Sequence, residues 1–122
     1  MCSMSAHPLP SIIIGDCLDI LKKQATNSID LIVTSPPYAD RRAKSYGGVK
    51  PEEYVAWFLP RADEFLRVLK PDGTFILNIK EKVEKGERHT FVIELILALR
   101  QHNWLWTEEL IWHKKTVRAK EE

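Results

Sequence analysis

Apolar and polar positions along the chain follow two kinds of pattern. Short runs rich in β-branched residues predict three buried strands, at 12–14, 29–34 and 74–79. Apolar residues repeated with helical spacing predict three helices, at 18–23, 51–70 and 89–102. The segment 104–112 carries tryptophans that would lie on one face of an extended chain, so it predicts a fourth strand. Between these elements, the alternating charges of 80–88 predict a solvated excursion.

Capping and turn residues mark the ends of these elements. Asp16 follows the first strand and is a suitable cap for the helix at 18–23. Pro51 stands at the first turn of the long helix, and Pro60 should kink or split that helix. Pro71-Asp72-Gly73 is a turn signal ahead of the third strand.

Strands that alternate with helices indicate an α/β fold with a largely parallel sheet. The strand at 29–34 is so continuously apolar that we expect both of its faces to be covered. In such a sheet, ligands bind beyond the carboxyl ends of the strands. We expect residues 1–122 to form a single domain in which 1–10 are disordered and 39–50 form a mobile basic loop.

Composition narrows the class of protein. The chain has 122 residues, of which 44% are hydrophobic and 29% charged, and its formal net charge is +1. No apolar stretch approaches the roughly 20 residues of a membrane span, and no charged segment of a secretory signal precedes 12–14. With only Cys2 and Cys17, we expect a reduced cytoplasmic protein without disulfides. The four histidines lack metal-ligand spacing, so no metal site is predicted.

The most informative segment follows the strand at 29–34, which runs directly into Ser35-Pro36-Pro37-Tyr38. Pro36 restricts Ser35 to extended geometry, and neither proline has a backbone N–H to donate. The turn is therefore stiff and presents carbonyl acceptors, beside the Ser35 hydroxyl and the Tyr38 ring. Such a group suits a planar ring that carries an NH₂ group. Taken alone, the same string is also compatible with a plain turn or a proline-rich ligand.

The segment resembles motif IV of the S-adenosylmethionine-dependent DNA amino-methyltransferases, in which Ser, Asp or Asn precedes Pro-Pro and an aromatic residue. The similarity extends to 15–21 ahead of the strand, and to 69–74 and 111–114 after it. This family methylates the exocyclic amine of cytosine (N4) or adenine (N6). The resemblance implies a Rossmann-like methyltransferase sheet with flanking helices, S-adenosylmethionine as cofactor and duplex DNA as substrate. Serine at position 35 favours N4-cytosine over N6-adenine.

The resemblance also implies catalytic roles for Ser35, Pro36, Pro37 and Tyr38. The Ser35 side chain and the Pro36 carbonyl would accept the two amine hydrogens. Such acceptors favour a pyramidal nitrogen whose lone pair points at the sulfonium methyl, so that catalysis rests on positioning and electrostatics. Tyr38 would stack on a base flipped out of the duplex.

Cofactor and DNA contacts are implied on either side of this motif. By its match to the early part of the family, Asp16 would contact the cofactor together with Cys17 and Ser35, although a plain helix cap explains Asp16 equally well. Four residues in the basic loop are candidates for contact with DNA, namely Arg41, Arg42, Lys44 and Tyr46. Phosphate contact is the favoured role of these cations, and a solvated loop is the alternative. A second basic cluster lies at 114–120.

Two regions of the family pattern are missing from the sequence. No glycine-rich motif I is present, and no target-recognition region follows residue 112. In the family, two strands of the missing half lie between the strand at 12–14 and that at 29–34, so we expect an incomplete sheet. We expect the amino-terminal half of a bacterial, archaeal or phage modification enzyme, completed by another half-chain or by a swapped oligomer. The alternatives are a non-catalytic remnant that binds nucleic acid or a partner, and an enzyme acting on RNA or protein glutamine.

Overall fold

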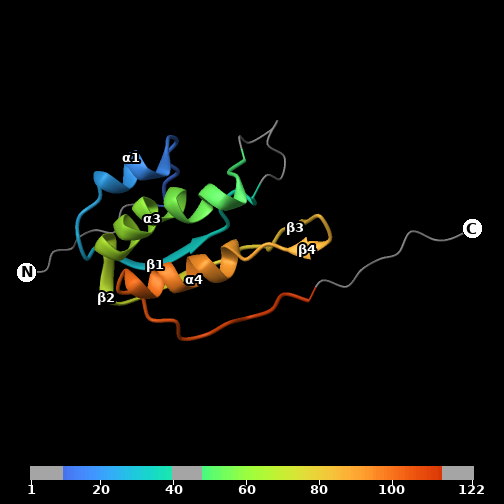
Figure 1. Ribbon diagram of the computed structural model, residues 1–122. Coiled ribbons are helices and arrows are strands. Elements are labelled where there is room, and N and C mark those ends of the chain that lie inside the picture. Colours follow the sequence, from blue (N-terminus) through green and yellow to red (C-terminus); the bar gives the residue numbers. More distant parts are fainter. Residues whose placement is uncertain (1–9, 40–47, 114–122) are drawn as a thin grey trace, which may run out of the picture.

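The computed structural model describes residues 10–39 and 48–113 (Figure 1). The helices and strands follow one another in the order α1 (Cys17–Lys22), β1 (Ile29–Thr34), α3 (Pro51–Val68), β2 (Leu69–Leu77), β3 (Val83–Glu84), β4 (Glu87–Arg88) and α4 (Phe91–Gln101). The predicted α/β class is confirmed, with a small parallel sheet formed by β1 and β2. Every predicted helix is present. None of the described helices is long and apolar enough to cross a membrane.

The predicted turn at 71–73 lies inside β2 and does not precede it. Leu31 to Thr34 pair in register with Thr74 to Leu77, but Ile29 pairs with Leu69. Residues 70–73 therefore lie opposite the single residue Asp30, so β2 bulges there. The strand begins at Leu69 instead of 74. A Cβ atom on Gly73 would lie 3.0 Å from the Lys70 carbonyl oxygen and 3.2 Å from the Asp30 carbonyl oxygen, so this close passage favours glycine.

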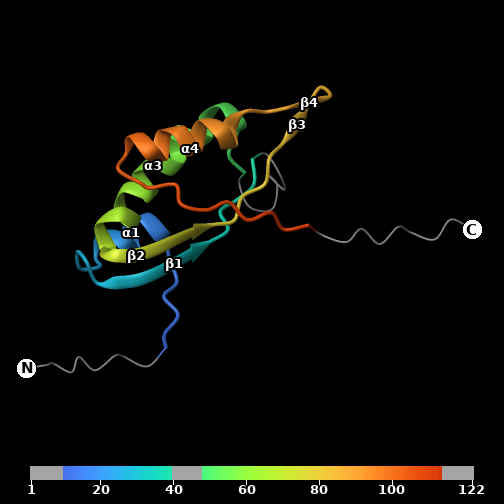
Figure 2. The same ribbon diagram turned by 90° about the horizontal axis from the view of Figure 1, so that it is seen from below.

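The hydrophobic core lies between the sheet and the helices α3 and α4, which cover the same face of the sheet (Figure 2). The sheet contributes Phe75, whose ring centroid lies 5.2 Å from that of Phe65 on α3 and 6.4 Å from that of Phe58. The buried residues of the two helices are Pro51, Tyr54, Phe58, Ala62, Phe65 and Val68 of α3, and Phe91 and Leu95 of α4. The helical spacing of large apolar residues predicted the core-facing aromatic residues and Leu95, but it did not indicate Ala62 or Val68. Leu66, expected on the same apolar face, is only partly buried.

The opposite face of the sheet is not covered by any of the described residues, contrary to the expectation for 29–34. Leu31 and Val33 of β1 are 53% and 63% exposed, and Ile76 of β2 is 45% exposed. The alternate residues Ile32, Phe75 and Leu77 point the other way and pack against the core. The uniformly apolar strand therefore has one buried face and one open face.

Pro60, expected to kink or split the long helix, does not split it, because α3 runs as one helix from Pro51 to Val68. Pro60 and Ala56, four residues earlier, both lie on the exposed side of the helix. The Ala56 carbonyl, which loses its helical donor to the proline, therefore faces water and needs no partner within the protein.

Two of the predicted strands do not form within the described chain. Ile12 and Ile14 are 93% and 95% exposed, and the segment 104–113 is extended but hydrogen-bonds to no neighbouring strand. A strand needs a partner for its backbone groups, and the described residues offer none to either segment. Figures 1 and 2 show 104–113 running back alongside α4. Of its tryptophans only Trp104 is partly buried, against Phe75.

The excursion predicted at 80–88 is an exposed two-stranded hairpin, β3 and β4, which projects beyond the carboxyl ends of β1 and β2 (Figure 1). Its turn consists of Lys85 and Gly86, with φ of 51° and 80°. Two successive positive φ values match the turn that best fits the twist of a hairpin.

Candidate functional site

The motif at 35–38 begins directly after β1, at the carboxyl end of the sheet. It lines an open cleft with a volume of about 1600 Å³, whose other walls come from the end of β2, the hairpin, α4 and the extended segment 104–112. The cleft contains all four of the predicted catalytic residues, Ser35, Pro36, Pro37 and Tyr38. The position agrees with the rule that ligands of parallel sheets bind beyond the carboxyl ends of the strands.

The Ser35 hydroxyl is held by a residue from the neighbouring strand. Asn78, just past the end of β2, donates from its side-chain nitrogen to Ser35 Oγ at 3.1 Å, and its backbone N–H donates to the Thr34 carbonyl at 2.9 Å. A hydroxyl oxygen has two lone pairs, so one remains to accept a hydrogen from a ligand. Asn78 was missed at the sequence level, although a polar residue ending an apolar strand was a usable signal.

The Pro37 and Tyr38 part of the motif is held from the helical layer. The Tyr54 hydroxyl, at the start of α3, donates to the Pro37 carbonyl at 2.6 Å. Burial, together with the nearby Tyr38, raises the pKa of Tyr54 to about 12, so this hydroxyl stays protonated. Ala39, the residue after Tyr38, is buried in the core. The sequence indicated Tyr54 only as an apolar core residue, and spacing alone could not have shown this contact.

Asp16 and Cys17, predicted to contact a cofactor, lie at the start of α1 and do not line the cleft. Asp16 Oδ1 accepts a hydrogen bond from the Leu18 backbone N–H at 2.9 Å, so the predicted helix cap is confirmed. Cys17 is an exposed free thiol. The cofactor role of both residues remains a prediction.

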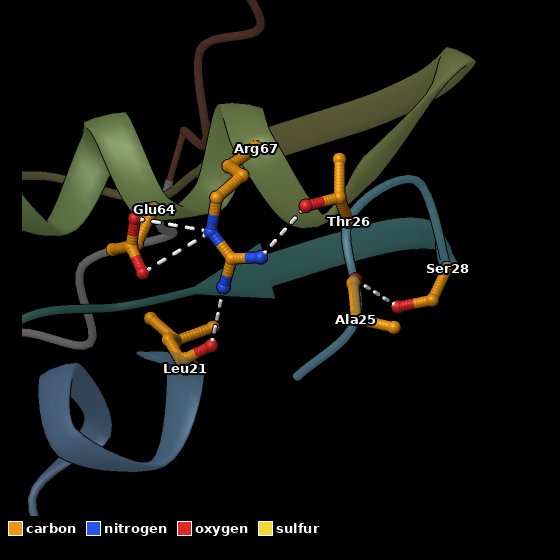
Figure 3. Close-up of polar contacts among 6 residues, drawn as sticks. All are labelled: Leu21, Ala25, Thr26, Ser28, Glu64 and Arg67. Carbon is orange, nitrogen blue, oxygen red and sulfur yellow. Dashed lines mark hydrogen bonds and ion pairs between the residues drawn. The ribbon is translucent and has the colours of Figure 1, made fainter. Parts of the chain in front are cut away.

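The segment after α1 is fastened to α3 by Arg67 (Figure 3). Its guanidinium donates to Glu64 on the same helix, to Thr26 Oγ1 at 3.0 Å and to the Leu21 carbonyl at 2.8 Å. The Arg67 backbone carbonyl also accepts from the Asn27 N–H at 3.0 Å. No residue of α1 is fully buried, and Leu21 packs against the core only in part, so these polar contacts add to its attachment.

The residues predicted to contact DNA lie outside the described part of the chain: Arg41, Arg42, Lys44 and Tyr46, with the cluster at 114–120. The ends of the predicted basic loop are described, and Ala39 and Val49 pack against the core there. Among the cations that line the cleft, Arg88 of the hairpin pairs with Glu81.

Residues 29–122 match the family model described as DNA methylase, which is more than half of the chain. The chain belongs to the DNA methylase family. Its fold agrees, because it is similar to a solved structure of the PvuII DNA methyltransferase (cytosine-N4-specific), with a TM-score of 0.61 and 37% identity. That similarity covers 72% of this chain and 32% of the other.

Curated relatives of the chain include type II methyltransferases. M.PvuII of Proteus hauseri is 43% identical over 76 residues, which are 62% of this chain and 23% of that protein. M.MwoI of Methanothermobacter wolfeii is 33% identical over 112 residues, which are 84% of this chain and 17% of that protein. The chain thus spans about a quarter or less of the length of these relatives.

Proposed function

We propose that this chain carries the target-amine site of a DNA methyltransferase that transfers a methyl group from S-adenosylmethionine to the N4 amine of cytosine, with the N6 amine of adenine as the less favoured target. The observation that supports it most is the stiff Ser-Pro-Pro-Tyr turn, which lines a cleft at the carboxyl end of β1 in a DNA methylase chain. Cytosine is favoured because the similar PvuII structure is named as cytosine-N4-specific.

The proposed chemistry relies on hydrogen-bond acceptors and not on a nucleophile. An exocyclic amine is a poor nucleophile because its lone pair is delocalised into the base. The free lone pair of Ser35 Oγ and the carbonyl of Pro36 would accept its two hydrogens and favour a pyramidal nitrogen. Asn78 holds Ser35 Oγ, and the two consecutive prolines restrict the backbone that carries the Pro36 carbonyl, so little reorganisation would be needed during transfer. Once methylated, the nitrogen would carry one proton too many, and this proton would be released to solvent.

The cofactor residues are a separate part of the proposal. S-adenosylmethionine, when bound, supplies the electrophilic methyl group on its sulfonium. Asp16 uses Oδ1 to cap α1, and Oδ2 forms no hydrogen bond within the described residues. The free oxygen has the chemistry to accept from the adenine amine, and Cys17 and Ser35 would be further contacts. A carboxylate acceptor of this kind supports a cofactor contact at the start of α1, which lies outside the cleft that holds Ser35.

The remaining part of the proposal concerns DNA and the cell. A base inside a duplex cannot reach a turn of this kind, so we infer that it is flipped out and stacked on Tyr38. The similar type II methyltransferases come from a bacterium and an archaeon, which suits a cytoplasmic restriction-modification system. The share of these relatives that the chain spans favours completion of the Rossmann-like sheet by further polypeptide, in the same chain, a half-chain or an oligomer.

Transfer of labelled methyl groups from S-adenosylmethionine to duplex DNA, by the longest form that the gene encodes, tests the proposal. Ser35→Ala should mainly lower turnover, and Tyr38→Ala should weaken base stacking by roughly 1–3 kcal/mol. Ser28→Ala is the matched control, because Ser28 precedes β1 at the opposite end of the strand and its hydroxyl, the group that the substitution removes, donates only to the Ala25 carbonyl. Unchanged single-turnover methylation in both motif variants would contradict the assignment.

A second candidate function is a methylase-like module that binds nucleic acid or a partner subunit without catalysis. The open apolar face of the sheet favours it, because such a face is suited to association. Titration with S-adenosylmethionine distinguishes the two. Absence of binding would favour the module, and methyl transfer to DNA would exclude it.

A further inference from the structure

Tyr54 is the one buried side chain in the described helices that reaches the Ser-Pro-Pro-Tyr turn with a hydrogen bond. Its ring is fully buried, and its centroid lies 4.9 Å from that of Phe91 and 5.4 Å from that of Trp57. Neighbours on α3 and α4 therefore fix the ring, and the hydroxyl is a donor in a fixed position. The proposed chemistry does not use this hydroxyl.

The acceptor of this bond is well placed to control the direction of Tyr38. The Pro37 carbonyl belongs to the planar peptide unit that joins Pro37 to Tyr38, so fixing its oxygen fixes the plane from which Tyr38 extends. Proline already fixes φ at position 37, and the remaining rotation, ψ, is the one that turns this carbonyl. On the other side of Tyr38, Ala39 is buried in the same cluster as Tyr54.

From these contacts we propose that Tyr54 is a positioning residue, which holds the Pro37–Tyr38 peptide so that the Tyr38 ring faces the target base. The inference rests on the proposed function, since it assigns a purpose to the direction of Tyr38. It adds a residue that acts on the site through the backbone, from a helix 17 positions further along the chain.

Tyr54→Phe removes the hydroxyl and keeps the ring, so it tests the hydrogen bond by itself. In the longest form of the protein, single-turnover methyl transfer should fall roughly 10-fold to 100-fold, the range expected for a small misplacement of a reacting group. The affinity for S-adenosylmethionine should stay within about 2-fold, because positioning of a base-stacking ring does not alter the cofactor contacts. The amide NMR resonances of Tyr38 and Ala39 should shift more than those of the core residues, because the Pro37–Tyr38 peptide loses its hydrogen-bond donor.

Phe65→Leu is the matched control, because it disturbs the same aromatic cluster but touches no residue of the motif. It should lower stability without the selective loss in transfer rate. A Tyr54→Phe variant with wild-type transfer and unchanged Tyr38 and Ala39 resonances would overturn the inference and leave the proposed function intact. A wild-type protein that neither binds S-adenosylmethionine nor methylates DNA would instead overturn the proposed function, and the inference with it.

Discussion

Both faces of the β1–β2 sheet carry apolar side chains, but helices cover only one of them. On the closed face, Phe75 packs against aromatic rings of α3. On the open face, Val33 and Ile76 are about half exposed or more, at 63% and 45%. The candidate site depends on the closed side, since Tyr54 reaches the motif from there. An apolar residue in a strand therefore stabilises this molecule only where a helix covers it.

The largest difference between the faces should come from Phe58→Ala. Phe58 is fully buried, with the rings of Phe65 and Phe75 at centroid distances of 6.2 Å and 6.4 Å. Its truncation should lower the free energy of unfolding by about 3–5 kcal/mol, because it removes a large buried side chain and leaves a cavity. Urea unfolding followed by circular dichroism measures this change. A loss below about 1 kcal/mol would show that the closed face is not the core.

The free energy of unfolding should fall by up to about 2 kcal/mol at alkaline pH, because the closed side also buries the titratable hydroxyl of Tyr54. The pKa of Tyr54 is raised to about 12 from its usual 10.0, mainly by burial. A pKa that is higher in the folded state stabilises the fold fully below pH 10, and this contribution is lost as the pH rises toward 12.

Comparison of wild type with Tyr54→Phe isolates this group. The pKa of Lys70 is raised by its hydrogen bond with Asp30, and it changes stability in the same direction, but it is present in both proteins. The difference between their unfolding free energies should therefore narrow between pH 10 and 12. A constant difference over that range would exclude a titrating Tyr54.

Most of the closed side could be predicted from sequence, because its helices have clear apolar periodicity. Local chemistry predicts a turn at Pro71-Asp72-Gly73. In the structure these residues lie within β2, where the pairing with β1 is irregular. The strands expected at 12–14 and 104–112 failed for a different reason. An apolar run indicates that a segment must be buried and paired with another strand. It does not indicate where that strand lies.

The sequence predicted the position of the candidate site but not the contacts that hold it. The position of the motif at 35–38 followed from the strand before it and the general rule for parallel sheets. The contacts that hold the motif, from Asn78 and Tyr54, come from 43 and 17 positions away. Contacts over such separations depend on the packing of whole elements, which no spacing rule within the chain describes.

Removal of the Arg67 side chain should lower the free energy of unfolding by about 1–2 kcal/mol, since it breaks the contacts to Thr26 and Leu21 and leaves α1 held mainly by the partly buried Leu21 side chain. Thr26→Val breaks one of these bonds and should cost less. Urea midpoints measure the loss, and hydrogen exchange should locate it in α1. Lys22→Ala, which alters an exposed cation of the same helix, is the control. Exchange that rises equally in β1 and α1 would contradict a local role for Arg67.

The smallest effect should come from the open face. Ile76→Thr keeps a β-branched side chain in β2 and removes little buried surface, so in the 122-residue chain it should change the unfolding free energy by less than about 0.5 kcal/mol. Leu77→Thr, one position along the same strand, points into the core and should cost clearly more. The pair differs in face and hardly in sequence position.

Repeating both substitutions in the longest form of the protein then asks whether further polypeptide covers the open face. If it does, the cost of Ile76→Thr should rise toward that of Leu77→Thr, because both residues would then lose buried contacts. A cost that stays small in the longer protein would mean that the face remains open there too.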